Sequence, residues 1–257
     1  MRPAAPRALF PATGDFSRLK ELDRAPSRFM ANVSHELRTP VTNLKLYARV
    51  LRNGLQPEKQ EHFLQVIEEQ ADRLAHMIQH ILEMTELDSG RATVERRPVS
   101  VAMLLEHVAA RYWTPAQQVN LTLSVEPVPP DLPSVEGDAH WLTLALGELV
   151  GNAVTFTPPG GQVAIEAGTA EEDGQRWVTV TVRDTGPGIT PQEQVQIFER
   201  LYRGSLADSG RIPGSGLGLS IVQEIAFVHG GRVMVESGPG QGSAFTLWLP
   251  AAQEAAG

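Results

Sequence analysis

The chain has 257 residues, which is enough for one large domain or two small ones. A formal net charge of −8 argues against nucleic acid as the main partner, because such proteins need a basic surface, and 42% hydrophobic content argues against global disorder. The absence of cysteine excludes disulfides and thiolate metal sites and fits a cytoplasmic location, which we expect. No run approaches 18 apolar residues, so we expect no membrane insertion by this chain.

The N-terminal region predicts little packed structure. Residues 1–16 are rich in proline and alanine, and we expect a disordered tail there and a second short tail at 251–257. Residues 17–27 favour a helical linker, the remnant of a signal helix, which Pro26 should interrupt. No sensor domain precedes it, so we expect either a piece of a longer chain or a protein that takes its input from a partner.

A helical hairpin is predicted over residues 28–92. The first helix carries apolar residues at heptad-like spacing, and Pro57 suits the first turn of a second helix that repeats the pattern to about Asp88. The first seam consists of Leu37, Val41, Leu44, Ala48, Leu51 and Leu55, and the second of Phe63, Ile67, Gln70, Leu74, Met77, Ile81 and Met84. Val66, Ile78 and Leu82 widen the apolar stripe beyond a two-helix seam, so we expect a homodimer with a four-helix bundle; packing onto the rest of the same chain is the alternative.

His35 is the candidate nucleophile of this hairpin. Helix geometry places it roughly 165° from the centre of the apolar stripe, facing solvent, with Glu36 beside it and Thr39 one turn further on. A neutral imidazole has a lone pair for attack on phosphorus, and a neighbouring carboxylate can accept the other ring proton. Pro40 removes a helical hydrogen bond directly after this group and predicts a kink. An ordinary surface histidine is the alternative interpretation.

Residues 98–250 alternate between helical and strand-like patterns, which predicts a mixed sheet covered by helices on one face. The expected helices are 101–112, 140–155, 191–201 and 215–229. The expected strands are 121–126, 162–166, 177–183, 232–236 and 244–249.

Two groups of residues in this region suit a nucleotide and its cation. Glu148 and Asn152 are four residues apart on one predicted helix and offer a carboxylate and an amide oxygen, which suit Mg²⁺. Asp184 ends a predicted strand and can accept a hydrogen bond from an amine such as adenine N6. Gly186 and Gly188 follow it and let the backbone approach a flat ring.

A glycine-rich segment before the last predicted helix is a candidate phosphate site. Its residues Gly214, Gly216, Leu217 and Gly218 open that helix, whose first N–H groups attract phosphate. The segment matches neither the dinucleotide fingerprint nor a P-loop. The stretch before it carries Arg200 and Arg203 and predicts a mobile lid that brings cations over phosphates.

Taken together, these segments resemble bacterial two-component sensor histidine kinases. The string from Phe29 to Pro40 is similar to the H box, and the segments at 148–157, 184–188, 197–200 and 214–218 resemble the N, G1, F and G2 boxes. The resemblance implies a dimeric four-helix bundle followed by an α/β two-layer sandwich of the Bergerat ATP-binding type. It also implies ATP and Mg²⁺ as cofactors and the receiver domain of a response regulator as partner.

The resemblance implies a role for each matching residue. His35 would accept the phosphoryl group, Glu36 would act as base, and Thr39 would orient water for dephosphorylation of the regulator. Asn152 would hold Mg²⁺, Asp184 would bind adenine, and the backbone at Gly216 and Gly218 would contact phosphates.

Three residues depart from the family pattern. Glu148 stands where Asn is usual, Thr155 where a phosphate-contacting Lys is common, and Leu201 where a second aromatic is frequent. A phosphatase- or ATPase-biased enzyme of the same fold and a nucleotide-binding dimeric scaffold therefore remain as alternatives to the kinase.

Overall fold

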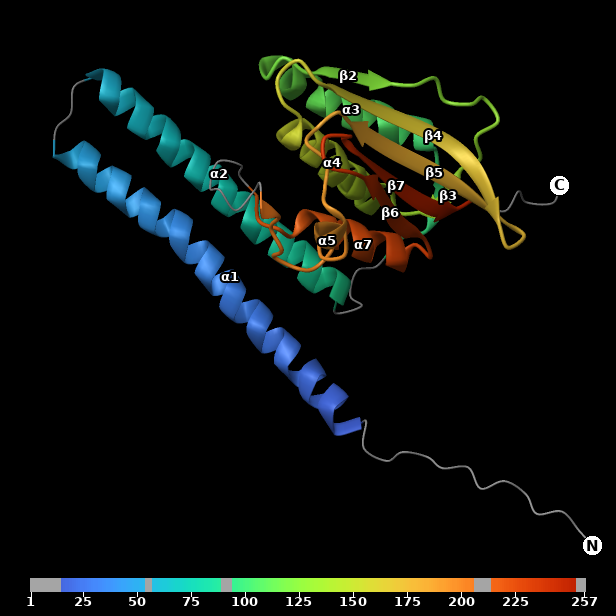
Figure 1. Cartoon of the computed structure of the whole chain (residues 1–257), viewed down its shortest axis with the longest axis horizontal. Coiled ribbons are helices and arrows are strands. Elements are labelled where there is room, and N and C mark those ends of the chain that lie inside the picture. Colours follow the sequence, from blue (N-terminus) through green and yellow to red (C-terminus); the bar gives the residue numbers. More distant parts are fainter. Residues whose placement is uncertain (1–14, 54–56, 89–93, 206–213, 253–257) are drawn as a thin grey trace, which may run out of the picture. The chain divides into compact units, whose positions relative to one another are not determined.

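The computed structural model describes residues 15–53, 57–88, 94–205 and 214–252, with side chains from residue 33 onward except those of 35, 57 and 58 (Figure 1). The chain divides into two compact units, Met1–Gln70 and Ala71–Gly257. Most of the two expected tails, residues 1–14 and 253–257, lies outside the described residues.

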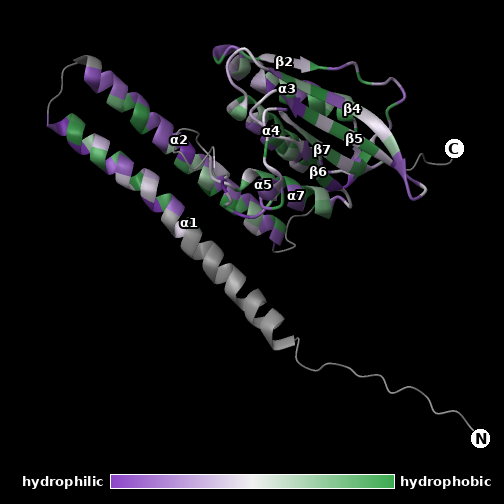
Figure 2. Ribbon diagram, in the orientation of Figure 1, coloured by the Kyte–Doolittle hydropathy of each residue, from purple (hydrophilic) through white to green (hydrophobic). Residues whose placement is uncertain are grey.

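The first unit contains helix α1 (Asp15–Arg52) and the first half of helix α2 (Pro57–Asp88). The two helices run antiparallel here, and the rings of Tyr47 and Phe63 pack with their centroids 5.6 Å apart. In the coloured parts of both helices hydrophobic and hydrophilic residues are interspersed along the ribbon (Figure 2), and an amphipathic helix has its apolar residues at intervals of three and four. The predicted hairpin is confirmed, with α2 ending at Asp88 as expected; the turn at Gly54 falls outside the described residues.

Helix α1 continues through both of its prolines. The prediction that Pro26 interrupts the helix is wrong, because α1 is unbroken from Asp15 to Arg52. A proline removes one hydrogen bond and costs about 3 kcal/mol, which a 38-residue helix absorbs without ending. Near Pro40, the Thr42 hydroxyl donates to the carbonyl of Arg38 at 2.8 Å. The kink expected at Pro40 stays a prediction.

The second unit is built on a five-stranded sheet in the order β2-β4-β5-β7-β6. Only the β2–β4 pair is parallel among the described strands, so the sheet is mixed. The strands are β2 (Thr122–Val125), β4 (Gln162–Glu172), β5 (Gln175–Asp184), β6 (Arg232–Ser237) and β7 (Ser243–Pro250). The helices are α3 (Val101–Gln118), α4 (Ala139–Phe156), α5 (Pro191–Gln194) and α7 (Gly218–Val228), together with residues 71–88 of α2.

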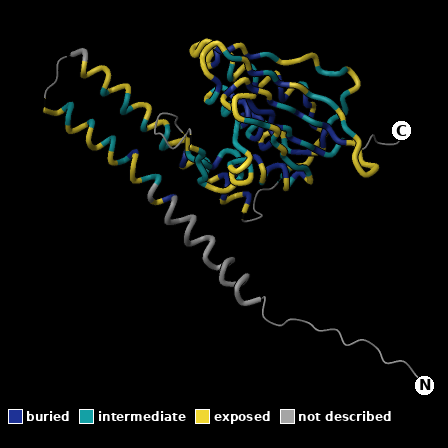
Figure 3. The backbone as a smooth tube through the Cα atoms, in the orientation of Figure 1, coloured by how far each residue is buried: buried dark blue, intermediate teal, exposed yellow. Residues whose placement is uncertain are grey.

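The core of this unit lies between one face of the sheet and helices α3, α4 and α7. Alternate strand residues are buried, as expected for a sheet covered on one side only (Figure 3). They include Val163 and Ile165 of β4, Val178, Val180 and Val182 of β5, and Leu247 and Leu249 of β7. The helices contribute Leu142, Leu146 and Leu149 of α4 and Ile221, Val222 and Ile225 of α7. The helical hairpin followed by an α/β two-layer domain is thus confirmed.

Element bounds differ from the sequence-based expectations in several places. The helix expected over 191–201 ends at Gln194 and turns follow, and Leu201 adopts a positive φ of 64° that no helix accommodates. Helix α7 begins at Gly218 rather than at 215, because Gly216 has a φ of 71°. Two three-residue strands, β1 (Arg97–Val99) and β3 (Val135–Gly137), pair antiparallel and were not predicted, since they are too short to show a period.

Within the described residues, none of the helices combines the length and the apolar character that a bilayer crossing requires.

Candidate nucleotide-binding site

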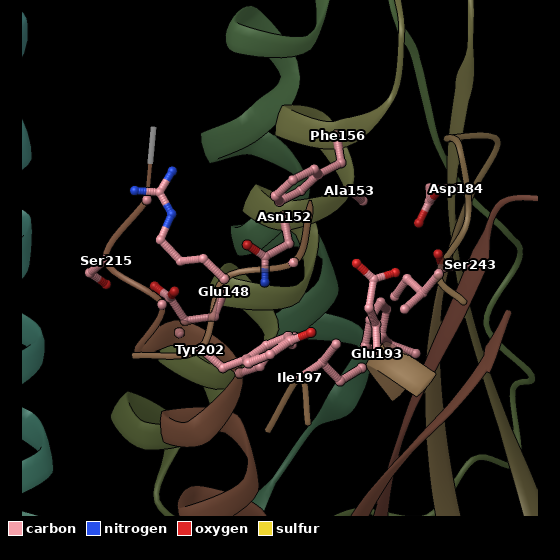
Figure 4. A pocket seen from close by; sticks show the side chains of 18 of the residues that line it. Glu148, Asn152, Ala153, Phe156, Asp184, Glu193, Ile197, Tyr202, Ser215 and Ser243 are labelled. Atoms are coloured by element: carbon pink, nitrogen blue, oxygen red, sulfur yellow. The ribbon is translucent and has the colours of Figure 1, made fainter. Parts of the chain in front are cut away.

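A cavity of about 230 Å³ opens in the second unit between α4, the loop after β5, the segment before α7 and the start of β7 (Figure 4). Its lining mixes carboxylates, an amide, glycines and aromatic rings, which is the composition of a small-molecule site. The lining residues are His80, Glu148, Asn152, Ala153, Phe156, Asp184, Pro187, Gly188, Ile189, Glu193, Ile197, Tyr202, Arg203, Gly204, Gly214, Ser215, Gly216, Gly218, Leu219, Ser243 and Phe245.

Helix α4 supplies the predicted cation ligands. Its N-cap Asp138 accepts a hydrogen bond from the backbone N–H of His140 at 2.9 Å, which fixes the start of the helix. One side of α4 is buried against the sheet, and Glu148 and Asn152 lie one turn apart on the side that faces the cavity. The spacing read from the sequence therefore places a carboxylate and an amide together at the cavity wall.

Asp184 lies at the end of β5 and is buried. Its Oδ1 accepts a hydrogen bond from the backbone N–H of Gly186 at 2.7 Å. Burial raises the pKa of this carboxyl, while the backbone N–H groups of Gly186 and Ser243 act in the opposite direction. The carboxylate is thus held in a fixed orientation at the cavity, where it can accept a hydrogen bond from a ligand.

The loop after Asp184 is fixed by the turn between β6 and β7. Gly188 has a φ of 73°, and a Cβ there would overlap the carbonyl oxygen of Gly238. The N–H of Gly240 donates to the Pro187 carbonyl at 2.7 Å, and the N–H of Ile189 donates to the Ser237 hydroxyl at 2.8 Å. Glycine is therefore required at position 188 by both conformation and space.

Glu193 connects α5 to the chain at Ser205 through hydrogen bonds. Its Oε2 accepts from the N–H and the hydroxyl of Thr190 in a capping box, at 3.3 and 2.8 Å. Its Oε1 accepts from the N–H and the hydroxyl of Ser205, both at 2.9 Å. The hydrogen bond from the Ser205 N–H, followed by those from the hydroxyls of Thr190 and Ser205, lowers the pKa of Glu193 to about 2. The carboxylate thus holds Ser205, which lies in the region expected to be a lid. Residues 206–213 of that region lie outside the described residues.

The second half of α2 also contacts this site. His80 places Nε2 3.1 Å from Oε1 of Glu148 and Nδ1 3.2 Å from the Ser215 hydroxyl. Burial, the largest single influence, lowers the pKa of His80, but the hydrogen bond and charge of Glu148 and the charge of Glu83 together raise it above its ordinary value.

Two further contacts join α2 to the rest of the second unit. Arg73 donates to the Gly214 carbonyl at 3.3 Å. Arg200 pairs with both carboxylate oxygens of Asp88, at 2.6 and 2.7 Å, and this hydrogen-bonded pair raises the pKa of Arg200. Asp88 is the last residue of α2, so Arg200 contacts the end of that helix.

Most of the residues predicted to bind nucleotide lie at the cavity. Those that line it are Glu148, Asn152, Asp184, Gly188, Arg203, Gly214, Gly216 and Gly218. Gly186, Arg200 and Leu217 do not line it: Gly186 holds Asp184, Arg200 binds Asp88, and Leu217 is fully buried. Leu217 contributes through its backbone, whose N–H donates to the Ser215 hydroxyl at 3.2 Å.

The predicted phosphoacceptor residues lie on α1 in the first unit. Thr39 is exposed and Glu36 is half-buried, while the side chain of His35 falls outside the described ones. Val33, four residues before the first residue of the predicted seam, is buried. The position of His35 within the helix is confirmed, and its orientation stays a prediction.

Several cavity residues were missed by the sequence analysis. His80, Glu193, Ser215 and Ser243 reach the cavity from different elements, and Phe156, Tyr202 and Phe245 supply aromatic surface. The pattern Thr190-x-x-Glu193 after a glycine was available as a capping-box signal. His80 had no such signal, because its partners are 68 and 135 residues away in the sequence.

Two family profiles match the chain. One, described as "His Kinase A (phospho-acceptor) domain", matches residues 26–90. The other, described as "Histidine kinase-, DNA gyrase B-, and HSP90-like ATPase", matches residues 137–253. Together they include the hairpin and most of the α/β domain, and they carry all the predicted site residues.

Individual proteins give the same result. "Sensor-like histidine kinase SenX3" of Mycobacterium tuberculosis is 35% identical over 242 residues, 94% of this chain and 58% of SenX3, so the chain spans little more than half of that relative. The crystal structure of full-length ShkA in complex with AMPPNP superposes with a TM-score of 0.64 at 32% identity, over 90% of this chain and 47% of that one. Histidine kinase ThkA in complex with the response regulator TrrA has a TM-score of 0.68 over 94% of this chain and 68% of that one; at 22% identity it shows the fold alone.

Proposed function

We propose that this chain, which belongs to the two-component sensor histidine kinases, uses ATP to phosphorylate its own His35 and passes the phosphoryl group to an aspartate of a response-regulator receiver domain. The observation that carries the proposal is the cavity on which Asp184, Asn152 and the glycines of residues 214–218 converge. The ShkA structure is a complex with AMPPNP, which supports ATP as the nucleotide.

Asp184 is assigned to the adenine amino group. Its carboxylate is buried and held by the Gly186 N–H, so it presents an acceptor in a fixed direction without further reorganisation. The aromatic rings of Phe156 and Phe245 in the cavity wall suit a flat base. The phosphates would then lie toward Gly214, Gly216 and Gly218 at the start of α7.

Glu148 and Asn152 fit a magnesium ion that accompanies the phosphates. Magnesium keeps several waters and binds through one or two protein oxygens plus phosphate, so it does not need a cage of side chains. When bound, the ion would offset negative charge on the phosphates.

The phosphoryl transfer is assigned to residues of α1. A neutral imidazole of His35 attacks the γ-phosphorus through one nitrogen, the N–P bond forms, and the bond from phosphorus to the bridging oxygen of ADP breaks. Glu36, the next residue, accepts the proton from the other ring nitrogen. Thr39, exposed one turn further on, would orient the water that later dephosphorylates the regulator.

A homodimer and a response regulator are the proposed partners. Leu46 and Leu64 in the first unit and Ile78 and Leu82 in the second are each more than 40% exposed, which a four-helix bundle would relieve. The match of residues 26–90 to the phospho-acceptor domain supports a receiver domain as the acceptor.

A phosphatase- or ATPase-biased enzyme is the second candidate. It is favoured by Glu148, which offers a base for water, and by Thr155, which is exposed and supplies no cation. A nucleotide-binding scaffold is the third candidate.

The test is incubation of the purified chain with γ-labelled ATP and Mg²⁺ beside a His35→Gln variant. The kinase predicts acid-labile, base-stable label on the wild type and none on the variant. Phosphate release without protein labelling would favour the hydrolase. A nucleotide-dependent rise in Tm with neither label nor release would leave a kinase that awaits its activator or the scaffold.

A further inference from the structure

Helix α2 reaches the nucleotide cavity through one histidine that the proposed function leaves without a role. His80 hydrogen-bonds both Glu148 and Ser215, and only 13% of its side chain and 19% of that of Glu148 remain exposed. Hydrogen bonds shielded from water to this degree are stronger than surface ones. A chance contact between two mobile surface side chains would not have this geometry.

The two ring nitrogens of His80 can both be satisfied at once. Nε2–H donates to Oε1 of Glu148, and the Ser215 hydroxyl, which accepts from the Leu217 N–H, has its own hydrogen to donate to Nδ1. A protonated ring would instead donate to both oxygens. Either form makes the bond to Glu148, so the contact does not depend on one protonation state.

The bond fixes how the Glu148 carboxylate is turned. With Oε1 held by His80, Oε2 lies against Gly218, where an added Cβ would overlap it. Oε2 is therefore placed beside the first residue of α7, on the cavity side, where the nucleotide phosphates are expected. Carboxylates that ligate metals are commonly held in this way by a second hydrogen-bonded partner.

We propose that His80 is a positioning residue that holds the Glu148 carboxylate in the orientation that binds the magnesium of Mg²⁺-nucleotide. Through this contact, His80 links helix α2 to nucleotide binding in the cavity. This inference rests on the proposed function, since it needs a nucleotide site at the cavity. Neighbouring contacts agree with the link: Arg73 and His80 lie seven residues apart on α2 and contact the adjacent residues Gly214 and Ser215. Cation binding and the contact of α2 with its site then favour each other.

The test compares ADP binding by isothermal titration calorimetry in Mg²⁺ and in EDTA, on the full chain. His80→Phe removes both ring nitrogens and is expected to weaken ADP binding in Mg²⁺ by about 10-fold or more, with ADP binding in EDTA unchanged. His80→Gln keeps a side-chain N–H donor and should recover most of the affinity. His76→Phe is the matched control, because His76 lies one turn away on the same helix and is exposed.

A double-mutant cycle locates the effect. In a Glu148→Gln background, His80→Phe should change Mg²⁺-ADP affinity far less than in the wild type, because the group it positions is gone. Equal or tighter Mg²⁺-ADP binding by His80→Phe would overturn the inference, as would an equal loss in EDTA. Absence of ADP binding by the wild type would instead contradict the nucleotide site itself, so the two failures are distinguishable. Tryptophan fluorescence of each variant serves as the check that it is folded.

Discussion

Glu193→Gln should destabilise the α/β domain by removing half of a four-bond carboxylate site. The carboxylate accepts two hydrogen bonds from Thr190 and two from Ser205. A glutamine has one acceptor oxygen, and its NH₂ group would face donors on the other side. The hydrogen bonds to either Thr190 or Ser205 are lost, and the glutamine NH₂ group then faces the N–H donor of that residue.

The magnitude follows from the pKa of Glu193, which falls from 4.5 to about 2. The difference of 2.5 units corresponds to at most about 3.4 kcal/mol at 1.36 kcal/mol per unit. The carboxylate is partly exposed, and solvent screening reduces this value, so we expect about 1–1.5 kcal/mol for the free energy of unfolding at pH 7.

The same shift predicts the pH dependence. A carboxyl whose pKa is lowered by folding stabilises the fold above its unfolded pKa, and this contribution is lost as pH falls from about 5 toward 2. All four tryptophans, Trp113, Trp141, Trp177 and Trp248, lie in the α/β domain, so urea unfolding followed by tryptophan fluorescence reports that domain. The difference between wild type and Glu193→Gln should shrink as pH falls through that window.

The control is Glu171→Gln, which makes the same chemical change at an exposed position of β4 and should have little effect. Equal unfolding free energies for wild type and Glu193→Gln at pH 7, or a difference that does not change between pH 7 and 3, would refute the reasoning about the capping carboxylate.

Three further outcomes are expected. Gly188→Ala should lower the free energy of unfolding in urea by at least about 2 kcal/mol, against about 1 kcal/mol for Gly174→Ala. Both glycines have φ near 75°, but of the two only Gly188 lacks space for a Cβ, and equal losses would contradict this reason. His229 is buried and its pKa is lowered mainly by burial, so the free energy of unfolding should fall as pH drops below about 6.5. This fall with pH should be shallower in His229→Leu, and an equal pH dependence of the two proteins would contradict a neutral buried ring. A double-mutant cycle of Arg200→Ala and Asp88→Ala should give a coupling of only about 0.5 kcal/mol, because both side chains are more than a third exposed; a coupling above about 2 kcal/mol would show a buried pair.

The sequence predicted where residues lie in the fold when a local pattern specified their position. Glu148 and Asn152 share a helix face by their spacing, and Asp184 ends a strand whose alternation is plain, so both placements could be read from the residues. The order of strands in the sheet could not, because β2 pairs in parallel with β4 across an intervening helix. Pairing of this kind is decided by packing and not by local propensity.

The errors have a common physical origin. Pro26 was expected to break α1 because propensity rules treat each residue alone, whereas a long helix absorbs the loss of one hydrogen bond. The pair that Arg200 forms with Asp88, 112 residues away, could not be predicted either, and the role of Arg200 toward phosphate stays a prediction. Charged side chains choose among distant partners, so their contacts are the part of a site that sequence spacing specifies least.

Glu148 illustrates how a distant partner changes the meaning of a residue. Alone, a carboxylate in place of the usual asparagine suggests a base for water and therefore a hydrolase. In the fold, its Oε1 already accepts a hydrogen bond from His80, and its Oε2 lies against Gly218. Oε1 is therefore engaged, whereas Oε2 has no hydrogen bond to His80 and lies on the cavity side. The substitution of Glu for Asn and the presence of His80 on α2 therefore form one feature, a carboxylate with its own hydrogen-bond partner, and the role of Glu148 has to be tested together with His80.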